Sequence, residues 1–77
     1  MTTVDRFWLH IAAARDHHRG KRHRAAQNRA REACLFAEEE CVISGVFGDS
    51  NRTWLARLDF ARNILRITLG VPAQPTP

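Results

Sequence analysis

Two cysteines and four histidines are the side chains of this chain with the most reactive chemistry. Cys34 and Cys41 are seven residues apart. On one continuous helix this spacing separates their Cα atoms by about 10 Å, which is too far for a disulfide. A zinc site typically needs two cysteines about two to four residues apart, and this pair is spaced more widely. The histidines lie in a cationic stretch that repels metal ions, so we expect no metal and no cofactor; they are His10, His17, His18 and His23.

The residue types needed for catalysis do not occur in a catalytic arrangement. Either cysteine could pair with a histidine as a nucleophile, but no orienting group or glycine turn for an oxyanion accompanies them. Gly45 and Gly48 match neither the dinucleotide-binding spacing nor that of a phosphate-binding loop. We therefore predict that the chain is not an enzyme and that it acts by binding.

Charge is strongly segregated along the chain, which carries a net charge of +4. Residues 15–31 hold seven basic residues against one acid, residues 32–49 hold five acids and no base, and residues 52–66 hold four arginines against one acid. A dense basic segment can neutralise the phosphates of a nucleic acid, but it can equally be a solvated helix junction. Its members form the candidate basic contact patch: Arg15, Arg19, Lys21, Arg22, Arg24, Arg29 and Arg31.

These side chains belong to a single predicted helical domain over residues 1–70, followed by a proline-rich tail over 71–77 that we expect to be disordered. Apolar residues recur at helical spacing in a first helix over about 3–19, capped by Thr2 or Thr3. A second helix is predicted over about 21–44. Gly20 favours a break between the two. One long helix through this glycine is an open alternative, because an interior glycine costs only about 1 kcal/mol.

The third predicted helix, over about 51–69, has more apolar surface than one neighbour can cover. One stripe faces the second helix in an antiparallel hairpin with it: Trp54, Leu58, Ala61, Leu65 and Leu69. The small residues of the second helix form the matching stripe: Ala26, Ala30, Ala33, Cys34, Ala37 and Cys41. The predicted fold is therefore all-α, with the N-terminal helix packed on this hairpin.

The remaining apolar residues favour an interface, and we expect a homodimer. The candidate interface residues are Phe60, Ile64, Ile67, Phe36 and Ile43. A helix-turn-helix beginning near Gly45 fits poorly, because the connection is long and the preceding helix presents Glu38, Glu39 and Glu40. Binding of the first helix to a membrane surface through Phe7 and Trp8 is a weaker alternative, since such residues are more often core.

No apolar run approaches the roughly 20 residues of a membrane span, and no apolar export segment begins the chain, so we expect a cytoplasmic protein. In size and composition the chain resembles the accessory proteins of bacteriophages and mobile elements, many of which bind and inhibit one host protein. We therefore predict a small basic regulator that inhibits or modulates a host partner protein. The alternative is a nucleic-acid-binding protein that grips phosphates through residues 15–31.

Overall fold

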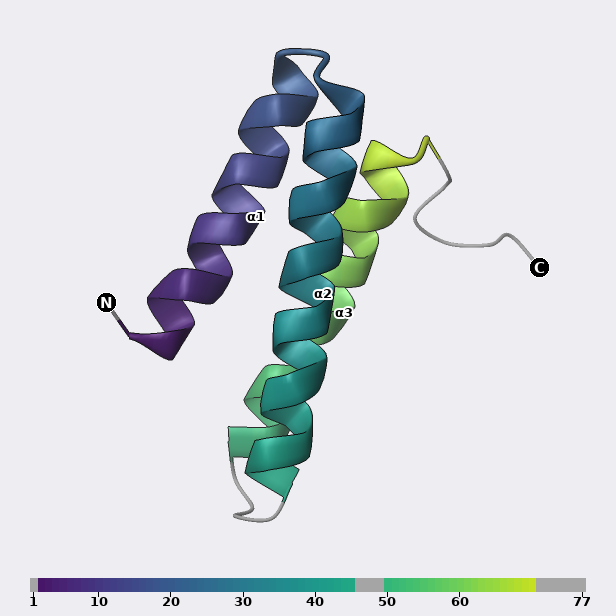
Figure 1. The fold of residues 1–77 in the computed structure, drawn as a ribbon. Helices are drawn as coiled ribbons and strands as arrows, with labels where there is room; N and C mark the ends of the chain where they lie inside the picture. The colour runs from purple at the N-terminus through teal and green to yellow at the C-terminus, as the bar shows by residue number, and fades with distance from the viewer. Residues whose placement is uncertain (1, 46–49, 71–77) are drawn as a thin grey trace, which may run out of the picture.

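The computed structural model describes residues 2–45 and 50–70, and within them the chain forms a bundle of three helices. They are α1 (Thr3–Arg19), α2 (His23–Gly45) and α3 (Ser50–Thr68). Both α1 and α3 pack along α2, whereas they touch each other over a short length only (Figure 1). The all-helical fold expected from the sequence is confirmed. The tail predicted over 71–77 and the turn residues 46–49 lie outside the described residues.

The first helix begins at a capping box built by Thr2 and Asp5. The Asp5 backbone N–H donates to Thr2 Oγ1 at 3.1 Å, and the Thr2 backbone N–H donates to Asp5 Oδ2 at 3.2 Å. Each side chain thus satisfies a backbone donor that the helix leaves without an internal partner. Of the two threonines that the sequence offered as caps, Thr2 is the one used.

The chain reverses direction between α1 and α2, so the alternative of one helix running through Gly20 is wrong. The Arg22 N–H donates to His17 O at 2.8 Å and the Lys21 N–H to His18 O at 3.0 Å, the bond pattern of a Schellman motif. The left-handed residue of this motif is Lys21, with φ 60°, whereas Gly20 has φ −79°. The second helix consequently begins at His23, two residues later than predicted.

The small residues of α2 lie at the centre of the core. Ala26, Ala30, Ala33 and Ala37 are fully buried, Cys34 is buried and Cys41 is half-buried. Side chains of this size allow neighbouring backbones to approach closely, which lets α1 and α3 both pack on one helix.

Both ends of α3 are hydrogen-bonded to α2. Near its start, Asn51 Nδ2 donates to Cys41 O at 2.8 Å, and at its end Gln27 Nε2 donates to Thr68 O at 3.3 Å. The helix ends at Thr68, which is buried, while Leu69 beyond it is half exposed. Leu69 was expected on the stripe that faces α2, and it leaves that stripe because the helix stops before it.

Candidate functional site

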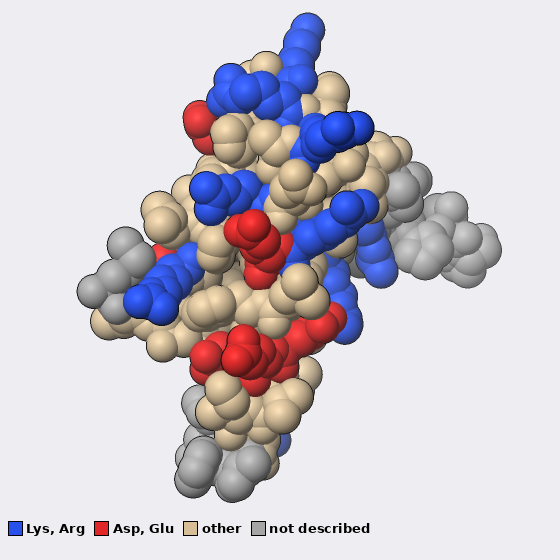
Figure 2. Space-filling model, in the orientation of Figure 1, with Lys and Arg blue, Asp and Glu red and all other residues tan. Residues whose placement is uncertain are grey.

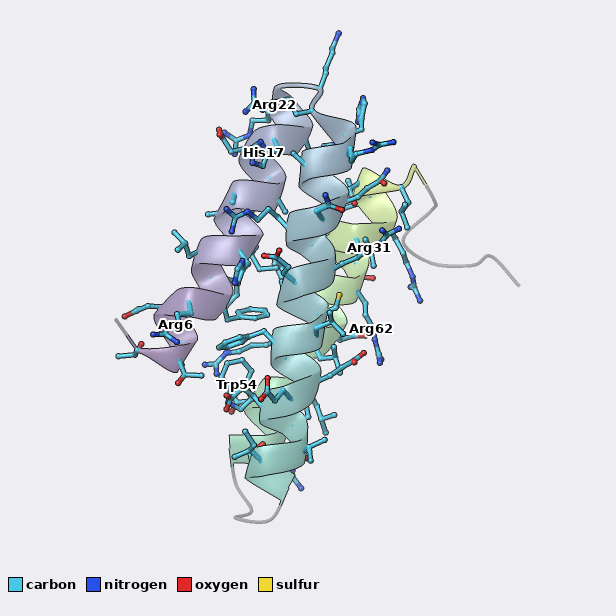
Figure 3. The ribbon with its side chains drawn as sticks, in the orientation of Figure 1. Arg6, His17, Arg22, Arg31, Trp54 and Arg62 are labelled. Carbon is cyan, nitrogen blue, oxygen red and sulfur yellow. The ribbon has the colours of Figure 1, made fainter. Side chains whose placement is uncertain are left out.

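Aromatic rings close the bundle where α1 approaches α3. The Phe7 ring is fully buried and meets the Trp54 ring edge-on, with centroids 5.7 Å apart. Trp54 also supports the Arg57 guanidinium, whose Cζ lies 4.6 Å from the ring centroid. Figure 3 shows Trp54 in the space between α1 and α2. These ring contacts set the distance between α1 and α3 at this level, because large rings packed edge-on prevent the two helices from moving closer together.

The outer rim of this closure is apolar and only partly covered. Trp8 of α1 and Phe60 of α3 meet edge-on with ring centroids 5.6 Å apart, yet they remain 42% and 38% exposed. Ile67, seven residues beyond Phe60 on α3, is 46% exposed. We call Trp8, Phe60 and Ile67 the apolar rim. The fold leaves these apolar side chains partly exposed to water.

Toward the C-terminal ends of α1 and α3, a partly open pocket of about 240 Å³ lies between the two helices. We call it the α1–α3 pocket, and it is lined by Arg15, His18, Arg19, Ile64, Ile67 and Thr68. Ile64 is buried in the core, so the apolar part of the lining is continuous with the hydrophobic core.

The α1 side of the pocket is cationic. Arg15 and Arg19 are exposed, and among the described residues neither forms an ion pair. His18 is half-buried, and its Nδ1 atom is buried without a hydrogen-bond partner within the described part of the chain. A buried polar atom left in this state costs free energy unless a further group bonds to it. The pocket therefore combines an apolar surface with positive charge.

The other predicted basic contacts lie elsewhere, on the turn and on α2. Arg22 Nε donates to His17 Nδ1 at 2.9 Å, and its guanidinium lies 3.6 Å from Asp16 Oδ2; Figure 3 shows Arg22 and His17 together at this end of the bundle. Arg29 Nη1 lies 3.8 Å from Glu32 Oε2 and 3.3 Å from His10 Nδ1. Lys21, Arg24 and Arg31 are exposed. The structure thus divides the predicted patch into two pocket arginines and five residues outside the pocket.

The predicted interface residues are likewise divided. Phe60, Ile64 and Ile67 lie along the α1-facing side of α3, in the apolar rim or the pocket. Phe36 is half-buried, with its ring centroid 6.3 Å from that of His10 and 6.1 Å from that of Trp54. Ile43 is half exposed near the end of α2. Phe36 therefore packs against the core, and Ile43 belongs to a separate exposed surface.

Acidic residues gather on the middle of the molecule, below the basic end. Figure 2 shows arginine and lysine over the α1–α2 turn and a band of acidic side chains across the middle. Within this region Glu38 Oε1 lies 3.7 Å from Arg62 Nη2, and both side chains are about half exposed. Basic side chains thus gather at the α1–α2 turn, and farther from the turn arginines lie beside the acidic side chains, as in the Arg29–Glu32 and Arg62–Glu38 pairs.

The cysteines are free thiols in a shielded environment. Burial, with the nearby Glu38 carboxylate, raises the pKa of the Cys34 thiol, and Arg62 opposes this shift. The pKa of the Cys41 thiol is also raised, mainly by desolvation. Both thiols therefore resist ionisation, which disfavours nucleophilic reaction. Among the described residues, no group of three or more histidine, cysteine or acidic side chains could hold a metal ion.

Sequence reasoning missed two members of the pocket and misplaced one member of the rim. His18 was considered as a possible metal ligand, Thr68 was not considered, and Trp8 was expected in the core with Phe7. A usable signal was present in α1, because Arg15, His18 and Arg19 are spaced i, i+3, i+4 and must share one helical face. Thr68 carried no such signal, since its role depends on where α3 ends.

No protein-family model, curated protein or solved structure matches this chain. None of the helices within residues 2–45 and 50–70 has the length and hydrophobicity required to cross a membrane.

Proposed function

We propose that this chain is a non-catalytic regulator that binds a partner protein and inhibits or modulates it. The observation that carries the proposal is the apolar rim of Trp8, Phe60 and Ile67, which stays partly exposed beside a pocket with two arginines that form no ion pair within the described part of the chain. Exposed apolar surface bordered by polar groups is typical of a protein-interaction site. The proposal keeps the cytoplasmic location and the host partner expected from the sequence.

The residue types at this surface support a protein partner. Tryptophan and arginine are enriched among the residues that dominate binding energy at protein interfaces, and apolar anchors at the centre of an interface are commonly surrounded by polar groups. Here Trp8 and Ile67 are the anchors, while Arg15 and Arg19 lie beside them. In this proposal the predicted hairpin of α2 and α3 is the scaffold that presents the surface, and α1 supplies its charge.

Self-association, which the sequence also predicts, has a separate surface available. Val42 and Ile43, near the end of α2, are exposed apolar residues outside the α1–α3 pocket. We propose that a homodimer uses this surface, so that the pocket stays free for the partner. Light scattering at tens of micromolar tests the dimer, and a dimer that Val42→Glu dissociates is the expected result.

Affinity purification of the full chain from a nuclease-treated lysate of its source organism tests the main proposal. We expect one protein to be recovered in a stoichiometric amount after nucleic acid has been removed. Recovery of no stoichiometric protein contradicts the proposal.

A nucleic-acid-binding role is the second candidate, and the basic end of the molecule favours it. Lys21, Arg24 and the pocket arginines are exposed near the α1–α2 turn, and Arg31 is exposed farther along α2. A protein that neutralises several phosphates loses affinity steeply as salt rises. Titration of labelled duplex and single-stranded DNA at low salt distinguishes this role, because a protein that binds only another protein gives no salt-dependent change in anisotropy.

A further inference from the structure

We propose that the α1–α3 pocket and the apolar rim accept an acidic amphipathic helix of the partner protein. This helix lies over α1 and α3, on the side away from α2, and completes a four-helix bundle. The inference rests on the proposed function and specifies the chemistry of the partner that this surface recognises.

The dimensions of the surface fit a helix. Trp8 and Arg15 on α1 are seven residues apart, as are Phe60 and Ile67 on α3, so each helix presents about two turns, or about 10 Å, to a guest. An amphipathic helix places apolar side chains at i, i+3 or i+4, and i+7, which covers the same length. One end of the guest's apolar stripe contacts Trp8 and Phe60, and the other enters the pocket against Ile64 and Ile67.

The charge of the surface requires an acidic guest. Arg15 and Arg19 lie beside the apolar lining without an ion pair among the described residues, and the pocket lining contains no acidic side chain. A guest that carries Asp or Glu beside its apolar stripe pairs with these guanidinium groups. A basic guest meets like charge instead. Complementary charge at an interface therefore decides between guests of equal hydrophobicity.

His18 also lines the pocket from α1. Its Nδ1 atom is buried and has no hydrogen-bond partner within the described part of the chain, so a guest on the surface does not reach this atom. The two pocket arginines, and not His18, favour an acidic guest.

A second copy of this chain is a poorer occupant of the surface. Face-to-face association through the α1–α3 pockets brings two sets of Arg15 and Arg19 into one interface, with no acid in either pocket lining to offset them. The acidic residues Glu38 and Glu39 lie on α2, outside the pocket. Like charges in one interface oppose association, whereas an acidic helix relieves the same repulsion.

The probe is a synthetic helical peptide of about 18 residues with leucines at i, i+4 and i+7 and glutamates flanking this stripe. A matched peptide carries lysine in place of every glutamate, and a third has the leucines scrambled. Fluorescence anisotropy with the full chain measures the affinity of each. We expect the glutamate peptide to bind at least about tenfold more tightly than either control peptide.

Two variants of the pocket and two matched surface variants locate the binding. We expect Ile67→Glu, and the double change Arg15→Glu with Arg19→Glu, each to weaken binding of the glutamate peptide by at least about tenfold. We expect Leu35→Glu and Arg31→Glu to change it by less than about twofold, because these exposed residues of α2 do not line the pocket. Circular dichroism verifies that every variant is folded, and NMR amide shifts in the folded chain must map binding to residues around Ile64 and Thr68.

Three results overturn the inference: equal binding of the lysine peptide, no binding of the glutamate peptide to the folded chain, or amide shifts confined to other surfaces. A dimer that Ile67→Glu dissociates also overturns it, because a second copy then occupies the pocket. Failure here is distinguishable from failure of the proposed function. If a partner is captured from the lysate while the glutamate peptide does not bind, the regulator role stands and the acidic-helix inference falls.

Discussion

Trp8 of α1 packs edge-on against Phe60 of α3, with the ring planes inclined at 64°. This contact is half solvent-exposed, yet it joins two helices that otherwise touch each other little. It therefore has two roles: it holds α1 beside α3, and it forms one end of the surface proposed to bind a partner.

The first prediction concerns the energy of this contact. In a double-mutant cycle of Trp8→Ala and Phe60→Ala, we expect a coupling energy of about 0.5–1.5 kcal/mol, the range of edge-on aromatic pairs. Urea denaturation followed by circular dichroism measures it. Additive effects of the two changes would show that the rings do not interact in solution.

Phe7 is the residue whose truncation should matter most for stability. Its ring is fully buried between Trp8, at a centroid distance of 5.0 Å, and Trp54. Truncation of a buried phenylalanine to alanine costs about 3–5 kcal/mol. A chain of this size is stable by only roughly 4–12 kcal/mol. We expect Phe7→Ala to lower the unfolding midpoint sharply or to abolish cooperative unfolding, while Leu35→Ala, at a position 64% exposed, leaves the midpoint nearly unchanged.

The turn between α1 and α2 should be improved by a glycine at position 21. Lys21 adopts the left-handed conformation, which L-residues with a Cβ disfavour by about 1 kcal/mol. We expect Lys21→Gly to stabilise the fold by about 0.4–1 kcal/mol, measured by urea denaturation. Lys21→Ala is the matched control, since it removes the same charge and keeps the Cβ; equal stability of the two variants would contradict the backbone explanation.

The neighbouring Gly20 has φ −79° and is not the left-handed residue of the turn. A Cβ at this position would meet the Arg22 guanidinium, which is the end of a flexible, half-exposed side chain and can move aside. Gly20 therefore marks the end of α1 in the sequence without being the position at which the turn favours a glycine.

The cysteines should react slowly in the folded chain. Because burial raises the pKa of both thiols, the thiolate fraction near pH 8 is smaller than that of an unfolded cysteine. We expect labelling by a disulfide reagent at pH 8 to be at least about tenfold slower in the folded than in the urea-unfolded chain. Single Cys34→Ser and Cys41→Ser variants assign each rate, and equal rates in both states would contradict the shielding.

The same shifts have a consequence for stability at alkaline pH. A thiol whose pKa is higher in the folded than in the unfolded chain stabilises the fold. This contribution has its full size at pH values below the pKa of the thiol in the unfolded chain. That contribution is lost as pH rises above the unfolded pKa, because the unfolded chain releases its proton first. Acidic conditions leave this contribution intact.

The sequence was sufficient to predict the helices, because each is specified by local signals. A threonine cap on α1, the apolar periodicity of α1 and α3, and the small-residue stripe of α2 all agree with the structure. The position of a side chain at a helix end was harder to predict. Leu69 was expected to face α2 and is instead half exposed, because α3 stops one residue earlier, at the buried Thr68.

The pocket could be predicted only in part. Ile64 and Ile67 were recognised among the apolar residues of the third helix that do not face the second helix, and Arg15 and Arg19 from the basic segment. What brings these two pairs together is the packing of α1 against α3, which depends on the rings of Phe7 and Trp54 and not on any local pattern. A helical wheel describes the faces of one helix and does not show how two helices far apart in the sequence pack together.

The most direct test of a partner-binding role compares three forms of the full chain in affinity purification from the same nuclease-treated lysate: wild type, Ile67→Glu and Leu35→Glu. Both variants place a new carboxylate at an exposed apolar position, but only Ile67 lines the α1–α3 pocket. We predict that the wild type and Leu35→Glu recover the same stoichiometric partner protein and that Ile67→Glu, still folded, loses it. Equal recovery by all three forms, or no stoichiometric partner with the wild type, would contradict the account.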